Sequence, residues 1–449
     1  MQGKEGNMNS LMAGCSRVKI TPPVGTPLDG NVRDKGCEGV HDDIYAKALV
    51  LNDGEKEIAI VSCALCAIPR AMVEDIRKIV EKRCTIPKEN ILVCVFHTHS
   101  GPTTGAIFKQ VNEDYLSSLP ERIASSICEA KQNVKKVKIK FASGEERELP
   151  NNRRIRMKDG TLRMNWEHLS LNEVDKPAGP VDPEVGVVMI EGLNGKPIAI
   201  LINYTCHPAI LAGDNFLISE DYPGYTMRLI EKKTGGICLF TNGAAGNINH
   251  INIFNPDQRR GFYEAERLGT ILGKKVLSII GVAKPIPVER LKMIREEIEL
   301  PLRKISASEI EKAKKLIEGK KVKKISMIDG LSDEVYAEQI LTLSKINEKS
   351  LTSEIQAISL GDIALVSIPG ELFVEYGLEI KKKSPFPHTF IVGYANDYVG
   401  YIPTLKAFGE GGYEVRTGIA SKLDPGVGEA IIKKALTLLE KIYGNAKRT

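Results

Sequence analysis

Short apolar runs alternate with segments of helical periodicity along most of this chain, and this alternation limits the folds open to it. Helical spacing of apolar residues is found at 71–84, 263–280 and 430–443. The strand-like apolar runs lie at 58–64, 91–96, 137–141, 187–190, 198–204, 237–241 and 355–366. Strands that alternate with helices are typical of α/β proteins, so the sequence predicts an α/β fold.

The stretch 286–353 has a different composition. Lys and Glu crowd residues 302–324, and helical periodicity dominates the stretch. We expect a charged helical excursion here, and a linker and a small subdomain are both compatible with it. The apolar strand pattern resumes after it.

Charge and hydropathy exclude some classes of partner. The chain carries 62 basic and 57 acidic residues, and the net charge of +5 is scattered, so no nucleic acid is expected. No run reaches the roughly 18 apolar residues of a membrane span, so no integral membrane segment is expected. The nine cysteines stand mostly alone in small or apolar surroundings, which is typical of reduced, buried thiols and predicts a cytoplasmic protein. A small molecule is the expected partner, and homo-oligomer formation stays open.

Two histidines follow the apolar run at 91–96. His97 and His99 are separated by one residue, and Gly-Pro ends the segment. Residues two apart in an extended chain point to the same side, so both imidazoles would project together at a strand end, where α/β proteins place ligand clefts. Paired imidazoles suit a divalent metal, zinc above all. Hydrogen-bonded turn histidines explain the same spacing equally well.

His207 follows another apolar run and precedes a proline, which favours an extended backbone at the histidine. A single histidine at a strand end is more often structural. An open catalytic zinc site, however, needs a third protein ligand beside a histidine pair. The two histidine motifs therefore support each other as parts of one zinc site.

Other polar residues also follow strand-like runs. Asn247 and Asn249 lie in a segment of small residues, where their amides could donate to an oxyanion, although a tight loop with Asn in turns is the simpler interpretation. Glu371 stands at the start of a predicted helix, a common position for an acid. Three tyrosines cluster within 394–401, which packing alone would explain.

These motifs together resemble the catalytic domain of neutral (alkaline, non-lysosomal) ceramidases. The matches run in order along nearly the whole chain, and His-Thr-His-Ser-Gly-Pro at 97–102 is the most specific. The other similar segments are 18–23, 39–42, 152–153, 219–225, 245–247, 369–371 and 400–404. The resemblance implies a neutral-ceramidase-type domain with mixed β-sheets flanked by helices. Because similar segments lie on both sides of 286–353, we expect residues 1–449 to form one catalytic domain with the excursion inside it.

The resemblance also implies roles for individual residues. The implied ligands of a zinc ion, Zn2+, are His97, His207, Glu371 and Tyr401. His99 would face the metal-bound water or the substrate and pass protons, and Arg153 would contact the substrate. Tyr413 would contact the scissile amide, and Gly30 would line the pocket. Residues considered for orienting a ligand imidazole are His41, Asp42 and Asp221.

Some features depart from the family pattern. Ceramidases carry a serine, their proposed nucleophile, where this chain has Asn249, and an amide cannot attack a carbonyl. We also expect neither a C-terminal immunoglobulin-like domain nor a secretory signal. Both points argue against ceramide as the substrate and leave zinc hydrolysis as the expectation.

We therefore expect a zinc-dependent hydrolase that cleaves an amide bond of a small soluble substrate with metal-activated water, an ester being the second choice. Tyr413 and Asn249 would donate hydrogen bonds to the oxyanion, worth about 3 kcal/mol each, and Asn247 and Arg153 would bind substrate. Two alternatives stay open: a non-catalytic, metal-stabilised binding protein, and a ceramidase that uses zinc-activated water alone. The acyl and amine groups cleaved, and a second metal, also stay open.

Overall fold

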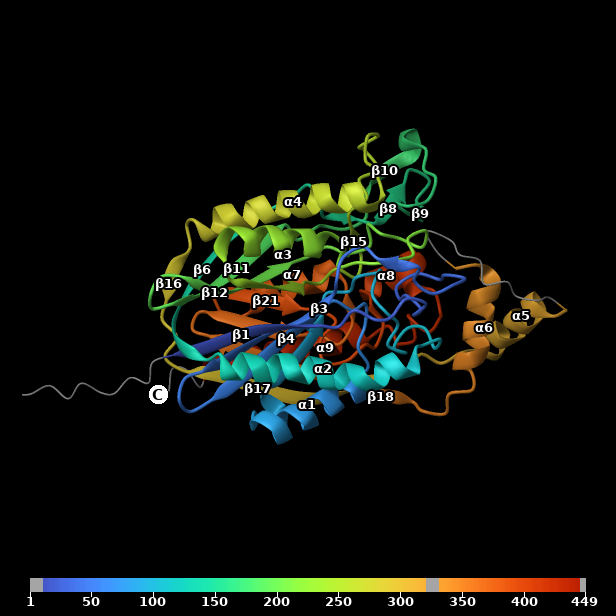
Figure 1. The fold of residues 1–449 in the computed structure, drawn as a ribbon. Coiled ribbons are helices and arrows are strands. Elements are labelled where there is room, and N and C mark those ends of the chain that lie inside the picture. The colour runs from blue at the N-terminus through green and yellow to red at the C-terminus, as the bar shows by residue number, and fades with distance from the viewer. Residues whose placement is uncertain (1–10, 320–330, 445–449) are drawn as a thin grey trace, which may run out of the picture.

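Four layers, alternating helix and sheet as α/β/β/α, make up residues 11–319 and 331–444, which the computed structural model describes (Figure 1). The first layer contains the helices α1 (Arg70–Cys84), α2 (Glu113–Gln132), α3 (Asp221–Thr234) and α4 (Gly261–Ile280). The fourth contains α7 (Val374–Lys383) and α9 (Val427–Gly444). The predicted α/β fold with mixed sheets flanked by helices is confirmed.

The second layer is a nine-stranded sheet in the order β14-β12-β11-β6-β1-β3-β4-β5, with β16 also paired to β6. Its strands are β1 (Met12–Lys19), β3 (Tyr45–Asn52), β4 (Glu57–Cys63), β5 (Ile91–Val95), β6 (Lys135–Glu145), β11 (Glu184–Gly192), β12 (Pro197–Tyr204), β14 (Ile237–Asn242) and β16 (Lys284–Ile286). The pairs β4–β5 and β12–β14 are parallel, and the others are antiparallel. The sheet curls, because β14 near one edge also contacts β4 and β5 near the other.

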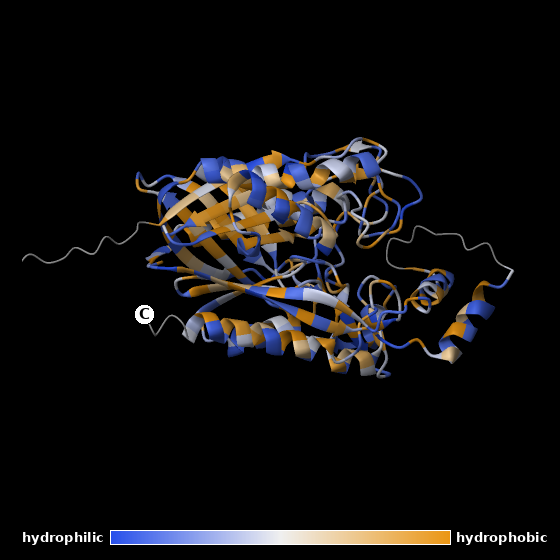
Figure 2. Cartoon of the chain, turned by 90° about the horizontal axis from the view of Figure 1, so that it is seen from below, coloured by the Kyte–Doolittle hydropathy of each residue, from blue (hydrophilic) through white to orange (hydrophobic). Residues whose placement is uncertain are grey.

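The third layer is a four-stranded sheet in the order β17-β18-β19-β21. Its strands are β17 (Leu291–Pro301), β18 (Ser350–Leu360), β19 (Ile363–Ser367) and β21 (His388–Val392), and only the pair β19–β21 is parallel. Figure 2 shows the strands rich in apolar residues between helices that carry polar residues outward.

Strand alternation explains why the two sheets stack. On β3, Leu49 and Leu51 point to the core between the sheets, whereas Ala48 and Val50 point to the core under the helices. Successive side chains of a strand face opposite sides, so a strand that is apolar throughout can join two cores. A third core lies between the four-stranded sheet and α7 and α9.

Short elements complete the described fold. The short strands are β2 (Gly39–Val40) with β13 (Leu217–Ile218), β7 (Asn151–Asn152) with β15 (Ile248–Asn249), β8 (Arg154–Met157) with β9 (Leu162–Met164) and β10 (Val174–Pro177), and β20 (Glu371–Leu372) with β22 (Tyr401–Ile402). The short helices are α8 (Leu405–Glu410) and the 3-10 turns Lys88–Asn90, Leu171–Glu173 and Tyr413–Val415.

The helical prediction for 286–353 is wrong at both ends. Residues 291–301 and 350–360 are the antiparallel strands β17 and β18. Their connection contains α5 (Ala307–Ile317) and α6 (Asp333–Leu343), which project from the body of the fold in Figure 1. β17 is an edge strand, and edge strands commonly carry exposed charges, which explains its misleading Lys and Glu content. The single catalytic domain over 1–449 stays a prediction, and residues 320–330 of the excursion lie outside the described part.

The prediction of reduced cysteines is wrong for two residues. Cys84 of α1 and Cys128 of α2 form a disulfide, whereas the other seven cysteines are buried free thiols. The cytoplasmic location stays a prediction. Among the described helices, none has both the length and the apolar character that crossing a bilayer requires.

Candidate metal centre and its cavity

The two histidines of the His-x-His motif lie together, but not in the extended geometry that the sequence predicted. β5 ends at Val95, and His97 has a left-handed backbone with φ of 71°. Its N–H donates to the carbonyl of Leu65 at 3.0 Å. The turn brings Nε2 of His97 within 3.3 Å of Nε2 of His99. A non-glycine residue with positive φ is uncommon and clusters at functional sites.

Backbone carbonyls orient the candidate ligand imidazoles. Nδ1 of His97 lies 2.5 Å from the carbonyl of Cys66, and Nδ1 of His207 lies 2.9 Å from that of Ala245. A carbonyl only accepts hydrogen bonds, so each Nδ1 carries the proton and each Nε2 keeps a free lone pair. Both imidazoles are buried.

The acidic and histidine residues considered for this orienting role lie elsewhere. Asp42 accepts from Ser219 and Glu220, and its neighbour His41 stacks on Phe262. Asp221 accepts the backbone N–H of Leu211. The prediction that these residues hold a ligand imidazole is therefore wrong.

Glu371 and Tyr401 are brought together by a pair of short parallel strands. They are register partners in the β20–β22 pair. The strands approach closely because Gly370 has no side chain, and a Cβ there would lie 2.5 Å from the carbonyl oxygen of Gly400. Glu371 thus lies in a strand, three residues before α7 begins at Val374, and not at the start of a helix as the sequence predicted.

Lone pairs converge at the centre of this group. Oε2 of Glu371 lies 3.6 Å from Nε2 of His97 and 3.5 Å from Nε2 of His207, and it has no hydrogen-bond partner. Its Oε1 accepts from the hydroxyl of Tyr398 at 2.5 Å. Facing acceptors with no donor between them are costly when buried. A divalent cation would relieve that cost, and imidazoles with a carboxylate are the ligands that zinc prefers.

Burial also shifts the titration of these groups. It raises the pKa of Glu371 to about 7 and lowers the pKa of His97 to about 3, and it lowers the pKa of His207 as well. Burial opposes charge on an isolated group. The charge of Arg153 lowers the pKa of Glu371, but burial outweighs it, which fits a site where a bound cation would further stabilise the carboxylate.

A second set of metal-type donors shares His97. Cys66, His97 and His99 each offer a ligand atom within 4.8 Å of the others. Sγ of Cys66 faces Nδ1 of His97, at 3.5 Å, and that nitrogen already donates to a carbonyl. We therefore assign the candidate metal centre to His97, His207 and Glu371, whose ligand atoms lie within the same limit.

A cavity of about 370 Å³ opens beside the candidate metal centre. Its walls include nearly all of the predicted site residues: Gly30, His97, His99, Arg153, His207, Asn249, Glu371, Tyr401 and Tyr413. They come from segments as far apart in sequence as the N-terminal loop and the turn after α8. Sequence motifs separated by hundreds of residues thus line one pocket.

Arg153 is held beside the centre by an acid and by rings. Its Nε donates to Glu414 at 2.8 Å. The guanidinium lies 5.3 Å from the ring centroids of Trp166 and Tyr401 and 5.8 Å from that of Tyr413, within cation–π range. Its Nη2 is buried without a partner. The predicted substrate-binding arginine therefore lines the cavity, and its Nη2 has N–H groups that could donate to a ligand.

The two asparagines have different surroundings from those predicted. Asn249 lines the cavity, but its amide pairs reciprocally with that of Asn165, through contacts of 2.9 and 2.7 Å. Asn247 is not among the cavity residues. Its amide accepts the backbone N–H of Val374 and donates to Glu375, at the start of α7. The prediction that Asn247 binds substrate is wrong, because its amide oxygen and its amide nitrogen both form hydrogen bonds within the protein.

Sequence reasoning missed several residues around the centre. Oδ1 of Asn31 lies 2.9 Å from Nδ1 of His99 and accepts its hydrogen bond, Trp166 lines the cavity near Arg153, and Asn165 pairs with Asn249. Tyr398 belonged to the noted tyrosine cluster but received no role. Its position in that cluster was the one available signal, because single Asn and Trp residues in loops carry no motif.

Gly30→Ala is expected to displace the ring of His99 and to lower by about tenfold or more the hydrolysis that we propose for this cavity, without loss of the proposed zinc ion, because catalysis is sensitive to small shifts of a ring within a site. A Cβ at Gly30 would lie 2.4 Å from the ring of His99, and φ is 82° there. The control is Gly160→Ala, where φ is 85° and the added Cβ meets nothing within 4 Å. Steady-state kinetics and metal analysis of both variants would check this. Equal effects in the two variants would contradict a specific role for the Gly30 contact.

Fold and site together define a mixed α/β protein with a buried histidine–glutamate group at a cavity. Residues 12–244 match the family described as neutral/alkaline non-lysosomal ceramidase, N-terminal, and the chain belongs to this family. It is 26% identical over 213 residues to neutral ceramidase A of Dictyostelium discoideum. That match covers 44% of this chain and 28% of the relative.

Solved structures show the same fold over nearly the whole chain. The neutral ceramidase from Pseudomonas aeruginosa superposes with a TM-score of 0.73 at 18% identity, and the match covers 96% of this chain and 74% of that one. A structure described as ceramidase complexed with C2 gives a TM-score of 0.75 at 18% identity, over 97% and 76% of the two chains. At this identity the likeness establishes the fold alone.

Proposed function

We propose that the protein is a zinc-dependent hydrolase that cleaves an amide bond of a small substrate. The observation that carries the proposal is the unpartnered Oε2 of Glu371 facing the Nε2 atoms of His97 and His207. These three residues, with Tyr401 beside them, would hold the metal. Zinc in such a site supplies Lewis acidity and a water whose pKa falls toward about 7.

Tyr413 is the proposed donor to the developing oxyanion. Burial raises the pKa of its phenol to about 12, so the hydroxyl keeps its proton at neutral pH. It lines the cavity next to Tyr401, with the ring centroids 5.8 Å apart. A preorganised donor of this kind is worth about 3 kcal/mol in the transition state.

His99 is the proposed proton acceptor. Its Nδ1 donates to Asn31, which leaves a lone pair on Nε2, the atom that lies 3.3 Å from Nε2 of His97 in the cavity wall. An imidazole held in one tautomer can take a proton from water and return it to a leaving amine. Asn249 has no nucleophilic oxygen, and its amide is paired with Asn165. This supports water, rather than a side chain, as the nucleophile.

Metal removal tests the proposal. Dialysis against a chelator is expected to lower amide hydrolysis about 100-fold or more, and zinc, but not calcium, should restore it, because nitrogen donors select against calcium. The measurement uses a panel of N-acyl and O-acyl substrates together with plasma emission analysis of metal content. Purified native protein without bound metal, or turnover that ignores the chelator, would contradict the proposal.

Ceramide is a second candidate substrate, because the family and its relatives are named as ceramidases. Fatty acid released from a short-chain ceramide would identify such an activity. A non-catalytic binding protein is the other candidate, favoured by Asn249. It predicts stoichiometric zinc with no turnover of any amide or ester in the panel.

A further inference from the structure

Positive charge lines the cavity from its inner end to its rim. The cationic wall residues are Arg33, Lys35, Lys109, Arg153, Arg260 and Arg416. The acidic ones are Glu338 and Glu371. Glu371 faces the candidate metal position, and acids outside the wall pair with Lys35, Arg153 and Arg416. Arg33 and Lys109 have no carboxylate within salt-bridge distance among the described residues. A cavity lined by one sign of charge concentrates ligands of the opposite sign.

The two inner cations, Arg153, which is buried, and Arg33, which is half-buried, lie beside the candidate metal centre. Arg33 donates to the carbonyl of His99 at 2.9 Å, and its other N–H groups also meet backbone carbonyls. Among the described residues, no carboxylate lies within salt-bridge distance of it. Asp29 is close by, but burial raises the pKa of that carboxyl to about 7. Arg153 is ion-paired with Glu414 through Nε, but its Nη2 is unpartnered although only 4% of the residue is exposed.

The rim holds an exposed cation that has no acidic partner in the described chain. Nζ of Lys109 donates to the carbonyl of Gly105 at 2.9 Å, and no acid of the described chain pairs with it. Two other rim cations do have acidic partners: Lys35 pairs with Glu38, and Arg416 pairs with Asp333. Lys109 is therefore the rim residue whose charge is available to a ligand.

The remaining wall is apolar over a large part of the cavity. Its apolar side chains include Leu28, Val32, Ile107, Phe108, Ile210 and Val335. A ligand that fits these walls needs an apolar portion and, within reach of Arg153, an anionic group. A carboxylate matches a guanidinium with free N–H groups, because it accepts charge-assisted hydrogen bonds. A neutral lipid amide would leave Nη2 without an ionic partner.

We propose that the substrate is an N-acyl amino acid, an amide whose acyl half is apolar and whose amine half carries a carboxylate. This proposal rests on the hydrolase function proposed above. The acyl chain packs along the apolar wall, and the carboxylate lies toward Arg153. Arg33 and Lys109 add attraction through their charge.

The experiment compares two substrates that differ only in charge, N-octanoylglycine and N-octanoylglycinamide, on the zinc-loaded full chain. At low salt the acid is expected to have a kcat/KM about tenfold higher than the amide, because one well-placed ionic contact is worth about that factor. The preference should shrink as ionic strength rises from about 0.05 to about 0.5 M, since salt screens exposed charges such as Lys109.

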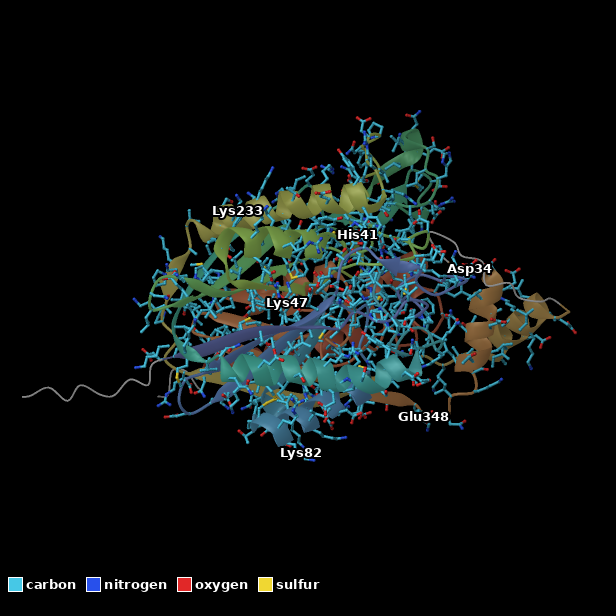
Figure 3. All side chains as sticks on the ribbon, in the orientation of Figure 1. Asp34, His41, Lys47, Lys82, Lys233 and Glu348 are labelled. Carbon is cyan, nitrogen blue, oxygen red and sulfur yellow. A yellow bond between two sulfur atoms is a disulfide. The ribbon has the colours of Figure 1, made fainter. Side chains whose placement is uncertain are left out.

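Two charge-reversal variants locate the effect. Lys109→Glu should reduce kcat/KM for the acid by about threefold or more, and for the amide by less, as expected for a rim charge. Lys82→Glu, on the outer side of α1, should change kcat/KM for neither the acid nor the amide. Figure 3 shows Lys82 away from Asp34, the sequence neighbour of the rim residue Lys35.

The outcomes separate this proposal from the hydrolase function. Equal kcat/KM for the acid and the amide would overturn acid recognition and leave the hydrolase function standing. No turnover of either would contradict the hydrolase function. Titration calorimetry with N-octanoylglycine and its amide then decides on acid recognition, because binding needs no turnover: tighter binding of the acid supports it, and equal or absent binding overturns it.

Discussion

Replacing His97 with alanine is expected to abolish stoichiometric zinc binding and to lower amide turnover about a thousandfold or more, because a three-residue zinc site loses a ligand and its activated water. The Nε2 atom of His97 lies 3.6 Å from Oε2 of Glu371. Without the imidazole, the carboxylate faces only His207. His207→Ala should have the same effect, since the two imidazoles have equivalent surroundings.

Loss of packing must be separated from loss of a ligand. The ring of His97 stacks on Tyr394 with centroids 4.2 Å apart, so alanine also leaves a void. His250→Ala is the matched control, because His250 is a buried histidine of the same cavity that is not part of the metal group. Plasma emission analysis and circular dichroism melts would be run on all three variants. Stoichiometric zinc in folded His97→Ala would place the metal elsewhere.

Periodicity and motifs were sufficient to predict much of the fold and of the site. The apolar runs at 58–64 and 91–96 became β4 and β5, because a strand buried on both faces needs continuous apolar sequence. His97 and Tyr401 share a cavity although they are far apart in sequence. The resemblance to a family supplied that long-range pairing, which spacing alone cannot give.

The remaining features depend on tertiary contacts that leave no local pattern. The helical prediction for 286–353 included residues 291–301, and only their pairing with β18 makes them the edge strand β17. The carbonyls that orient the imidazoles have no side-chain signature at all. The pairing of Asn249 in β15 with Asn165 in a turn links two segments far apart in sequence, so its consequence for the oxyanion role was not visible in the sequence.

Glu371→Gln is expected to weaken zinc binding about 100-fold or more and yet to stabilise the metal-free protein, because a neutral amide removes a buried charge but is a poor zinc ligand. The amide oxygen of the variant can still accept the hydroxyl of Tyr398. Its new N–H groups would face the lone pairs of His97 and His207, which have no donor in the metal-free site. The substitution thus replaces facing acceptors with hydrogen bonds.

The stability difference between Glu371→Gln and the wild type is expected to depend on pH. The pKa of Glu371 rises from its ordinary value of 4.5 to about 7 in the folded protein. Between these values the folded state holds a proton that the unfolded state has released, so stability of the metal-free wild type falls as pH rises, by roughly 3 kcal/mol in all. The amide side chain of the variant does not titrate, so the stability advantage of the variant should grow from pH 4.5 to pH 7.

Chemical denaturation with chelator present would measure this difference in stability. Added zinc should reverse the order of stability, because the metal binds tightly only to the wild-type carboxylate and so stabilises the folded wild type. A variant that is less stable than wild type without metal at pH 7 would mean that the carboxylate has another buried partner.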